Sequence, residues 1–170
     1  MKRTSLPPVS RPDARILILG SMPGALSLQE QQYYAQPRNA FWQVMGELFG
    51  AGREMPYETR LETLKQRRIA LWDVLASCYR AGSLDADIRK GDAVANDFDA
   101  FFSTHPDIGR VYFNGATACR FYERLVKPGL AVPGARLRYE RLPSTSPANA
   151  AMRLKDKVRV WRAALSQQRP

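Results

Sequence analysis

Cysteine and histidine are scarce in this 170-residue chain, which contains two cysteines and one histidine. Two cysteines cannot supply the four thiolates of an iron–sulfur cluster, and Cys78 and Cys119 lack the spacing of a metal site. We expect both as reduced, buried thiols. His105 precedes a proline in an expected loop, so we expect it at the surface rather than as a metal ligand.

Long apolar segments are also absent. No apolar run approaches the length of a membrane span, and residues 1–8 contain no apolar stretch of signal-peptide length. We therefore expect a soluble cytoplasmic protein with no membrane partner.

The segment Gly20-Ser21-Met22-Pro23-Gly24 follows an expected strand but lacks the signatures of three known loops. Ala25 stands where a Walker loop needs lysine, and the third glycine of a dinucleotide fingerprint is missing. The serine is one place early for a hydrolase nucleophile elbow. These absences disfavour a nucleotide hydrolase or transferase. They leave a loop that brings backbone close to a ligand, or a plain structural turn.

Positive charge is abundant. The chain contains 26 Lys and Arg residues but 16 Asp and Glu residues, so its net charge is +10. Such a surplus favours an anionic partner, of which nucleic acid is the first candidate, although a merely soluble basic protein is the alternative. Hydrophobic residues make up 45% of the chain, which indicates a globular protein. The length predicts one domain over residues 1–170.

The hydrophobic pattern alternates between strands and helices. Short apolar runs predict four strands, over residues 15–19, 69–74, 110–114 and 136–142. Helical spacing predicts helices over residues 39–49, 57–67, 97–103, 116–126 and 150–167. This order predicts an α/β fold with a parallel sheet and helices on both faces. The loops after Leu19, Trp72, Phe113 and Leu142 should then form the site.

Three segments show no regular pattern. Residues 1–13 are expected as an extended lead-in, and residues 77–95 as irregular structure. Residues 21–36 are expected as one long loop, and loops of that length are often functional.

Two polar segments could carry chemistry. Asn39 lies near a helix start, where an asparagine is most often a cap but could also hold a water molecule or a base edge, and Tyr34 could stack on a nucleobase. The loop 143–149 is rich in hydroxyl groups that can bind phosphates, and its Pro147 or Ala148 could wedge into a base stack. The helix after it carries cations that form either a solvated face or a DNA contact, namely Arg153, Lys155, Lys157, Arg159 and Arg162.

Separated segments together resemble one family. The Gly20–Gly24 segment with Tyr33-Tyr34-Ala35-Gln36-Pro37-Arg38-Asn39-Ala40-Phe41-Trp42 resembles the first motif of hypoxanthine-DNA glycosylases, a branch of the uracil-DNA glycosylase superfamily. Leu142-Pro143-Ser144-Thr145-Ser146-Pro147-Ala148-Asn149 resembles its second motif, and Leu71–Val74 and Phe113–Gly115 are also similar to family segments. The resemblance implies a three-layer α/β/α domain with a four-stranded parallel central sheet, and it implies base flipping.

The resemblance also implies roles for particular residues. Asn39 takes the catalytic role, because related branches place an acid or amide near Met22 and methionine cannot do that chemistry. Members of this branch often have a histidine where this chain has Gln36, so the resemblance does not determine the hydrogen bonds at this position. The residues expected to bind the flipped base are Gly20, Ser21, Met22, Pro23, Tyr34 and Asn114. Those expected to grip the DNA backbone are Ser144, Thr145, Ser146, Pro147 and Ala148.

The expected reaction is hydrolysis of an N-glycosidic bond in double-stranded DNA that contains a deaminated base. Asn39 would aim a water at the anomeric carbon, while loop N–H groups and Asn114 stabilise the departing base. Asp73 would assist if it faced the pocket, but a cap after its strand is the favoured expectation. No metal, cofactor or obligate protein partner is implied. Hypoxanthine is the first candidate base, and a uracil or mismatched-thymine enzyme or a noncatalytic DNA-binding module is the alternative.

Overall fold

A four-stranded parallel sheet lies at the centre of the computed structural model, which describes residues 1–133 and 136–166. Its strands, in the spatial order β3-β2-β6-β7, are β2 (Ile16–Gly20), β3 (Ile69–Asp73), β6 (Arg110–Asn114) and β7 (Arg138–Leu142). Every residue of β2 and β3 is buried, as expected where helices cover both faces of a parallel sheet. The predicted α/β fold and the parallel sheet are confirmed.

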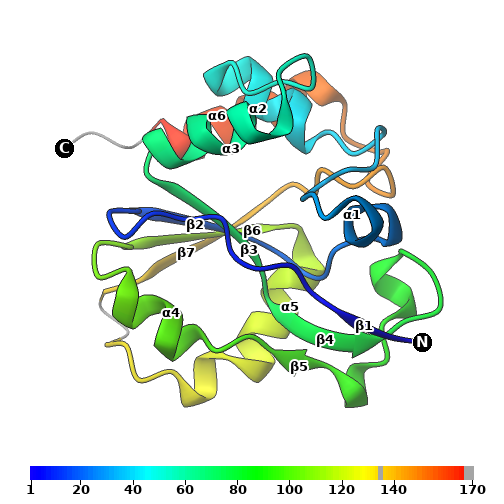
Figure 1. The fold of residues 1–170 in the computed structure, drawn as a ribbon, viewed down its shortest axis with the longest axis vertical. Helices are drawn as coiled ribbons and strands as arrows, with labels where there is room; N and C mark the ends of the chain where they lie inside the picture. Colours follow the sequence, from blue (N-terminus) through cyan, green and yellow to red (C-terminus); the bar gives the residue numbers. More distant parts are fainter. Residues whose placement is uncertain (134–135, 167–170) are drawn as a thin grey trace.

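Helices form a layer on each side of this sheet (Figure 1). One layer contains α2 (Phe41–Phe49), α3 (Tyr57–Gln66) and α6 (Leu154–Leu165). The other contains α4 (Phe98–Thr104) and α5 (Ala116–Leu125). The three-layer α/β/α architecture that the family resemblance implied is therefore present.

Aromatic side chains pack within both helical layers and, in the second, against the sheet. In the first layer, Phe41 of α2 meets Trp42 and Trp161 edge to face, with ring centroids 4.9 and 6.1 Å apart. In the second, Trp72 of β3 packs on Phe98 and Phe101 of α4 at 5.1 and 4.9 Å. Large apolar surfaces are thus removed from water on both faces, which provides most of the stabilisation of such a domain.

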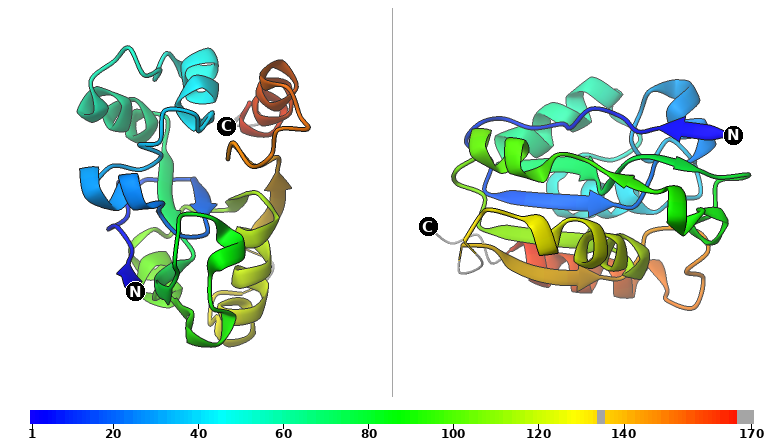
Figure 2. Two further views of the ribbon diagram at one scale, coloured as in Figure 1. Left: turned by 90° about the vertical axis from the view of Figure 1, so that its right-hand side faces the viewer. Right: turned by 90° about the horizontal axis from the view of Figure 1, so that it is seen from below.

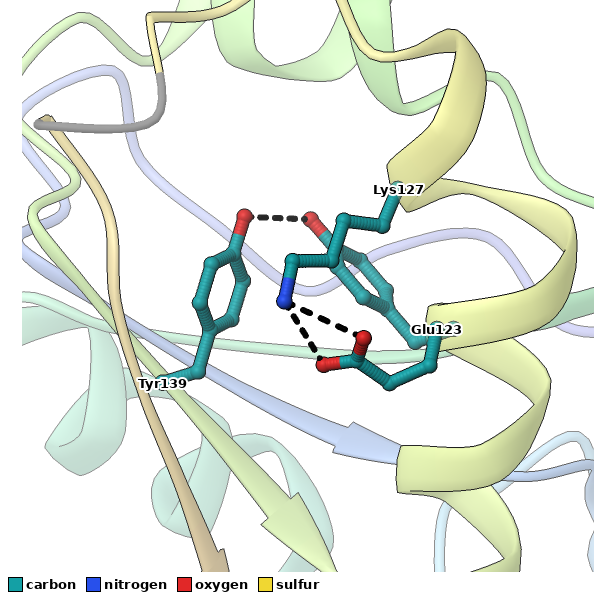
Figure 3. Close-up of polar contacts among 4 residues, drawn as sticks. Glu123, Lys127 and Tyr139 are labelled. Atoms are coloured by element: carbon teal, nitrogen blue, oxygen red, sulfur yellow. Dashed lines mark hydrogen bonds and ion pairs between the residues drawn. The ribbon is translucent and has the colours of Figure 1, made fainter.

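Side chains of α5 and of the turn after it contact Tyr139 of the edge strand β7 (Figure 3). Tyr139 of β7 has its hydroxyl 3.4 Å from the hydroxyl of Tyr122. The ammonium of Lys127, in the 3-10 turn η3 (Lys127–Gly129), lies 5.2 Å from the Tyr139 ring centroid and 3.0 Å from Glu123 Oε1. These contacts hold Tyr139 against α5, although β7 itself is largely exposed.

The N-terminal segment covers the opposite edge. Val9 pairs with Leu71 of β3 through two backbone hydrogen bonds of 2.9 and 2.8 Å. The expected lead-in therefore protects an edge strand, which would otherwise offer unpaired backbone groups to another chain.

A second, antiparallel sheet is a feature that the sequence pattern did not predict (Figure 1 and Figure 2). It has the order β1-β4-β5, with β1 (Lys2–Thr4), β4 (Leu75–Tyr79) and β5 (Val94–Ala95). The turns η1 (Asp85–Asp87) and η2 (Lys90–Asp92) lie between its last two strands. The expectation of irregular structure over 77–95 holds for most of residues 80–93 but is wrong at both ends, which lie in β4 and β5. These short strands are formed by pairing between segments distant in sequence.

Several predicted boundaries also differ. The expected loop 21–36 contains helix α1 (Ala25–Glu30). The last helix begins at Leu154 rather than Ala150, because the Asn149 carbonyl accepts from Lys157 Nζ instead of a helical N–H. Helix α2 begins two residues after Asn39, and β7 begins at Arg138. The expected helix end at residue 167 lies outside the described residues.

His105 is buried, so its expected surface position is wrong. Its ring stacks on Phe101 at 4.1 Å, and its Nε2 lies 2.9 Å from Ser10 Oγ. Both cysteines are free thiols, as expected, with Cys78 buried and Cys119 half-buried. Among the described helices, none has the length and apolar character needed to cross a bilayer.

The buried central strand predicts a large stability effect for Leu17→Ala. Leu17 is 0% exposed, so truncation leaves a cavity and should lower the free energy of unfolding by about 2–5 kcal/mol. Denaturant unfolding measures this, with Val94→Ala as control: Val94 is 55% exposed and should change stability by only about 0.5 kcal/mol. Equal effects for the two variants would contradict the observed packing.

Candidate active site

A cavity of about 610 Å³ opens at the carboxyl ends of the four parallel strands. Each strand contributes the residues that follow it, as the parallel topology predicts. All the expected site residues line it: Gly20, Ser21, Met22, Pro23, Tyr34, Asn39, Asn114, Ser144, Thr145, Ser146, Pro147 and Ala148. The fold therefore brings together side chains that are more than one hundred residues apart in sequence.

The side-chain amide of Asn114 links the two motif loops. Its Nδ2 donates to the Tyr34 hydroxyl at 3.1 Å and to Thr145 Oγ1 at 2.8 Å. Its Oδ1 accepts from the Thr145 backbone N–H at 2.9 Å. The Thr145 carbonyl in turn accepts from the N–H of Ala40 at 2.9 Å, just before α2. Because both ends of this amide are engaged with the protein, Asn114 positions its neighbours, while direct contact with a base stays a prediction.

Glycine is required where β6 turns into α5. Gly115 has φ of +95°, a conformation that side chains rarely adopt, and a Cβ there would lie 2.9 Å from the Cβ of Ser144. The close approach lets the second motif loop lie directly beside the end of β6.

Tyr34 lies in a strained position on the cavity wall. It is a non-glycine residue with φ of +54°, and its ring stacks on Phe41 with centroids 4.1 Å apart and planes 21° apart. Burial, and then the nearby Asp73 carboxyl, raise the pKa of Tyr34, so its hydroxyl stays protonated. Since Phe41 covers one face of the ring, a base could stack only on the opposite face.

Arg53 fixes the backbone that carries Tyr34 and Asn39. Its guanidinium donates to carbonyl oxygens of this segment, at 2.9 Å for Tyr34, 2.6 Å for Gln36 and 3.3 Å for Asn39, with a longer contact of 3.5 Å to Ala35. The sequence analysis missed this residue, because an arginine after a glycine-rich turn resembles a solvated surface charge. The Gln36 side chain also stabilises the turn, since its Oε1 accepts from the Arg38 N–H at 2.9 Å.

Asn39 caps the start of α2 and also lines the cavity. Its Oδ1 accepts from the Phe41 N–H at 3.0 Å, and the side chain is half-buried. A carbonyl oxygen has two lone pairs, so one cap bond leaves a second acceptor position on Oδ1. The capping and functional interpretations of Asn39 are thus compatible.

The second motif loop is anchored from behind by α6. Trp161 Nε1 donates to the Pro143 carbonyl and Lys157 Nζ to the Asn149 carbonyl, both at 3.0 Å. Lys157 is 5% exposed and burial lowers its pKa, so this cation holds the loop rather than a phosphate. Arg153 and Arg159 each lie 3.5 Å from Asp156. The expected DNA-facing row of cations on α6 is therefore wrong for Lys157.

Hydroxyl groups organise the tip of this loop. Ser144 Oγ accepts from the Ser146 N–H at 3.1 Å, and Ser146 Oγ accepts from the Ala148 N–H at 3.2 Å. A hydroxyl that accepts one bond can still donate, so both serines keep a donor for a phosphate.

Asp73, at the end of β3, faces the cavity and is 3% exposed. It lies beside Gly20 in the β2–β3 register, and a Cβ on Gly20 would collide with its Oδ1 and touch the Tyr34 hydroxyl at 3.0 Å. Among the described residues, the buried Oδ2 makes no hydrogen bond of normal geometry, although the Ser5 hydroxyl acts on this carboxyl. Burial, and then the Asp85 carboxyl, raise the pKa of Asp73 to about 7. Of the two expectations for this residue, the structure supports the one in which it faces the pocket.

The segment Ser83–Ala86 forms a wall that the sequence analysis missed. Asp85 accepts a 2.6 Å hydrogen bond from Ser21 Oγ, which ties this wall to the first motif. Behind it, the 2% exposed Arg80 donates to the Pro23 carbonyl, while its Nε and Nη1 have no partner. The η1 segment lacks hydrophobic periodicity, so no local signal marks it as part of a site.

Within residues 1–133 and 136–166, no cluster of three or more His, Cys, Asp or Glu side chains is placed to hold a metal ion. The chemistry that the cavity offers is hydrogen bonding by amides, hydroxyls and one buried carboxyl.

Comparisons with known proteins agree over nearly the whole chain. A family model described as the uracil DNA glycosylase superfamily matches residues 7–165. A hypoxanthine DNA glycosylase of Methanosarcina acetivorans is 38% identical over 164 residues, which cover 96% of this chain and 98% of that relative. One of Methanosarcina barkeri is 40% identical over 116 residues, covering 68% and 72%. A solution NMR structure from M. acetivorans, described as a candidate uracil DNA glycosylase, has a TM-score of 0.78 at 36% identity, and the match covers 98% of this chain and 100% of that one.

The hydrogen bonds of Thr145 predict that Thr145→Val destabilises the protein. Thr145 is 0% exposed, and the change removes the acceptor of an Asn114 N–H inside the site. The free energy of unfolding should fall by about 1–3 kcal/mol. Denaturant unfolding of the exposed Thr59→Val on α3 is the matched control, with an expected change within about 0.5 kcal/mol. A neutral Thr145→Val would show that the Asn114 link does not stabilise the fold.

Proposed function

The chain belongs to the uracil DNA glycosylase superfamily and is a DNA glycosylase, and we propose that the base it removes is hypoxanthine, in double-stranded DNA. The observation that carries this proposal is the cavity that collects both motif loops at the carboxyl ends of the strands. The names of the two Methanosarcina relatives support hypoxanthine as the base. No partner protein is required by the proposal.

The target base has to leave the duplex before it can enter this cavity. A glycosidic bond inside a base stack cannot be reached by side chains, so the nucleotide rotates out into a pocket. The loop Ser144–Ala148 forms part of the cavity rim, and its rigid Pro147 tip is suited to fill the vacated space in the stack.

Asn39 positions the attacking water in this mechanism. Its amide does not ionise near neutral pH, so it accepts a hydrogen bond from water without removing the proton outright. The second acceptor position on Oδ1 holds the water, and the cap bond to Phe41 fixes the direction in which it points. Orientation of a nucleophile can supply a large part of a barrier reduction.

DNA phosphates bind at the positive and hydroxyl-bearing rim. The donors of Ser144 and Ser146 and the exposed Arg38, which also lines the cavity, are the groups placed for this contact. The net charge of +10 makes association favourable and dependent on salt concentration.

Base release from a duplex tests the proposal. Purified protein is incubated, in excess, with labelled duplexes that contain one hypoxanthine, uracil, xanthine or mismatched thymine, and abasic sites are then cleaved with alkali. We expect cleavage at hypoxanthine, and we expect Asn39→Ala to reduce the single-turnover rate about 100-fold or more, because the water loses its acceptor. Asn39→Asp is the matched control: it keeps the cap and an acceptor, and should retain activity within about tenfold.

Each other outcome has a definite meaning. Cleavage mainly at uracil keeps the mechanism and replaces the substrate. Salt-sensitive DNA binding without cleavage of any duplex contradicts the proposal and favours a noncatalytic module. If Asn39→Ala cleaves as fast as the unaltered protein, Asn39 only caps α2, and another group positions the water.

Activity is expected to survive removal of divalent metal. The proposed steps need hydrogen bonds to water and to the departing base, and neither step uses a metal-bound group. Cleavage of the hypoxanthine duplex is measured after dialysis against EDTA, with and without added Mg²⁺, and equal rates are expected. Activity that appears only with added metal would contradict this mechanism.

A further inference from the structure

One carboxyl group, that of Asp73, lines the cavity and is 3% exposed. Its Oδ1 lies on the side of Gly20, another cavity residue, because a Cβ on Gly20 would collide with this oxygen. Its Oδ2 is buried behind the cavity, where the Ser5 hydroxyl acts on the carboxyl. Oδ1 is therefore the carboxyl oxygen placed toward a ligand. Its position is fixed by backbone pairing, because Asp73 aligns with Gly20 between adjacent strands.

No basic side chain among the described residues forms an ion pair with Asp73. Arg80 is the cation near it, and its guanidinium donates to the Pro23 carbonyl rather than to Asp73. Asp85 lies on the neighbouring wall and adds negative charge. Because Asp85 already brings one negative charge to this region, the surroundings disfavour ionisation of Asp73.

The titratable and polar groups that face Asp73 come from several elements. Burial and Asp85 raise the pKa of Asp73 to about 7, while Arg80 and the Ser5 hydroxyl act in the opposite direction. Tyr33 and Tyr34 also face it, and its charge raises the pKa of each, after burial. At slightly acidic pH the carboxyl is mostly protonated and can donate a hydrogen bond.

We propose that Asp73, in its neutral form, is a catalytic residue that donates a hydrogen bond to the departing base. The proposal rests on the proposed function, since it concerns the base that this cavity receives. The recognised group is an oxygen or nitrogen of the base on which negative charge develops as the glycosidic bond breaks. Hypoxanthine and uracil both carry such acceptors, so the role holds for either substrate.

The reaction balances with Asp73 as a hydrogen-bond donor. The electron pair of the C1′–N bond stays with the base, and the oxygen of water forms a new bond to C1′ and gives its proton to the solvent. The carboxyl keeps its own proton and stabilises the base anion by the hydrogen bond. A low-dielectric cavity makes one such donor strong, and removal of a comparable donor costs about 10²–10³ in rate.

An ionised Asp73 would act in the opposite way. A carboxylate beside a departing anion repels it, and it offers no donor. Protonated carboxylic acids that donate a hydrogen bond to a developing anion are known in buried sites. The two states therefore predict opposite dependences of rate on pH.

The experiment compares unaltered protein with Asp73→Asn and Asp73→Ala on the base it cleaves, in single turnover with excess enzyme from pH 5.5 to 8.5. The rate of the unaltered protein should fall about tenfold per pH unit once Asp73 ionises. This fall, the alkaline limb of the pH profile, should begin at about pH 7 or above, because the negative phosphates of bound DNA favour the protonated form of Asp73. Asparagine keeps a neutral donor, so Asp73→Asn should stay within about tenfold at pH 6 and lose the alkaline limb. Asp73→Ala should lose about 100-fold.

Two further readouts separate this role from a structural one. Asp85→Asn removes a neighbouring charge and should move the alkaline limb to lower pH. The unfolded carboxyl titrates near 4 and the folded one near 7, so the unaltered protein loses stability as pH rises through this window, whereas Asp73→Asn does not. The Tm of Asp73→Asn relative to the unaltered protein should therefore increase from pH 5 to pH 7.5 and level off above it.

The outcomes are distinguishable. If the unaltered protein cleaves and Asp73→Asn is as inactive as Asp73→Ala while still folded, the inference is wrong and the proposed function stands. A rate that rises through pH 7 and depends on Asp73 would mean that the carboxylate acts as a base, which also overturns it. If the unaltered protein releases no base at all, the proposed function falls, and this inference falls with it.

Discussion

The Asn114 amide is the interaction on which the geometry of the site depends. It lies at the end of a central strand and holds Tyr34 on one side and Thr145 on the other, so it links the first motif loop to the last. A planar amide with both ends engaged leaves little freedom to either loop. Behind it, Arg53 and Lys157 hold the same two loops by their carbonyl oxygens. The flexible parts of the site are thus attached to rigid strands and helices, which is what a catalytic arrangement needs.

Much of the fold could be predicted because local hydrophobic patterns in the sequence specify its strands and helices. The buried strands are continuous apolar runs, and the helices between them show a clear apolar face, so the parallel sheet and its layers follow from residue order. The parallel topology alone then places the ends of these strands together. The loop resemblance added the particular side chains, such as Asn39, and the cavity contains every one of them.

The rest depended on contacts between distant segments. The strands β1, β4 and β5 are too short to show a clear hydrophobic period, and they form because they pair with one another. Charge patterns carry no information on burial, so Arg53 and Lys157 could not be distinguished from solvated cations. The wall at Asp85 is irregular in sequence, and its place beside Ser21 is a consequence of tertiary structure.

If Asn39 holds the water, as proposed, its chemistry sets a demand on the rest of the site. An amide can orient water but cannot take its proton, so in this mechanism the attack on C1′ is weakly assisted and the bond to the base breaks largely on its own. The proposed mechanism therefore needs stabilisation of the leaving group. Asp73, the strained Tyr34 and the bare backbone of Gly20 all line the cavity and lie beside one another. Each lowers stability, and such costs concentrate where function requires them. The two proposals are therefore complementary: a buried acid that keeps its proton would supply the donor that a catalytic amide at Asn39 lacks.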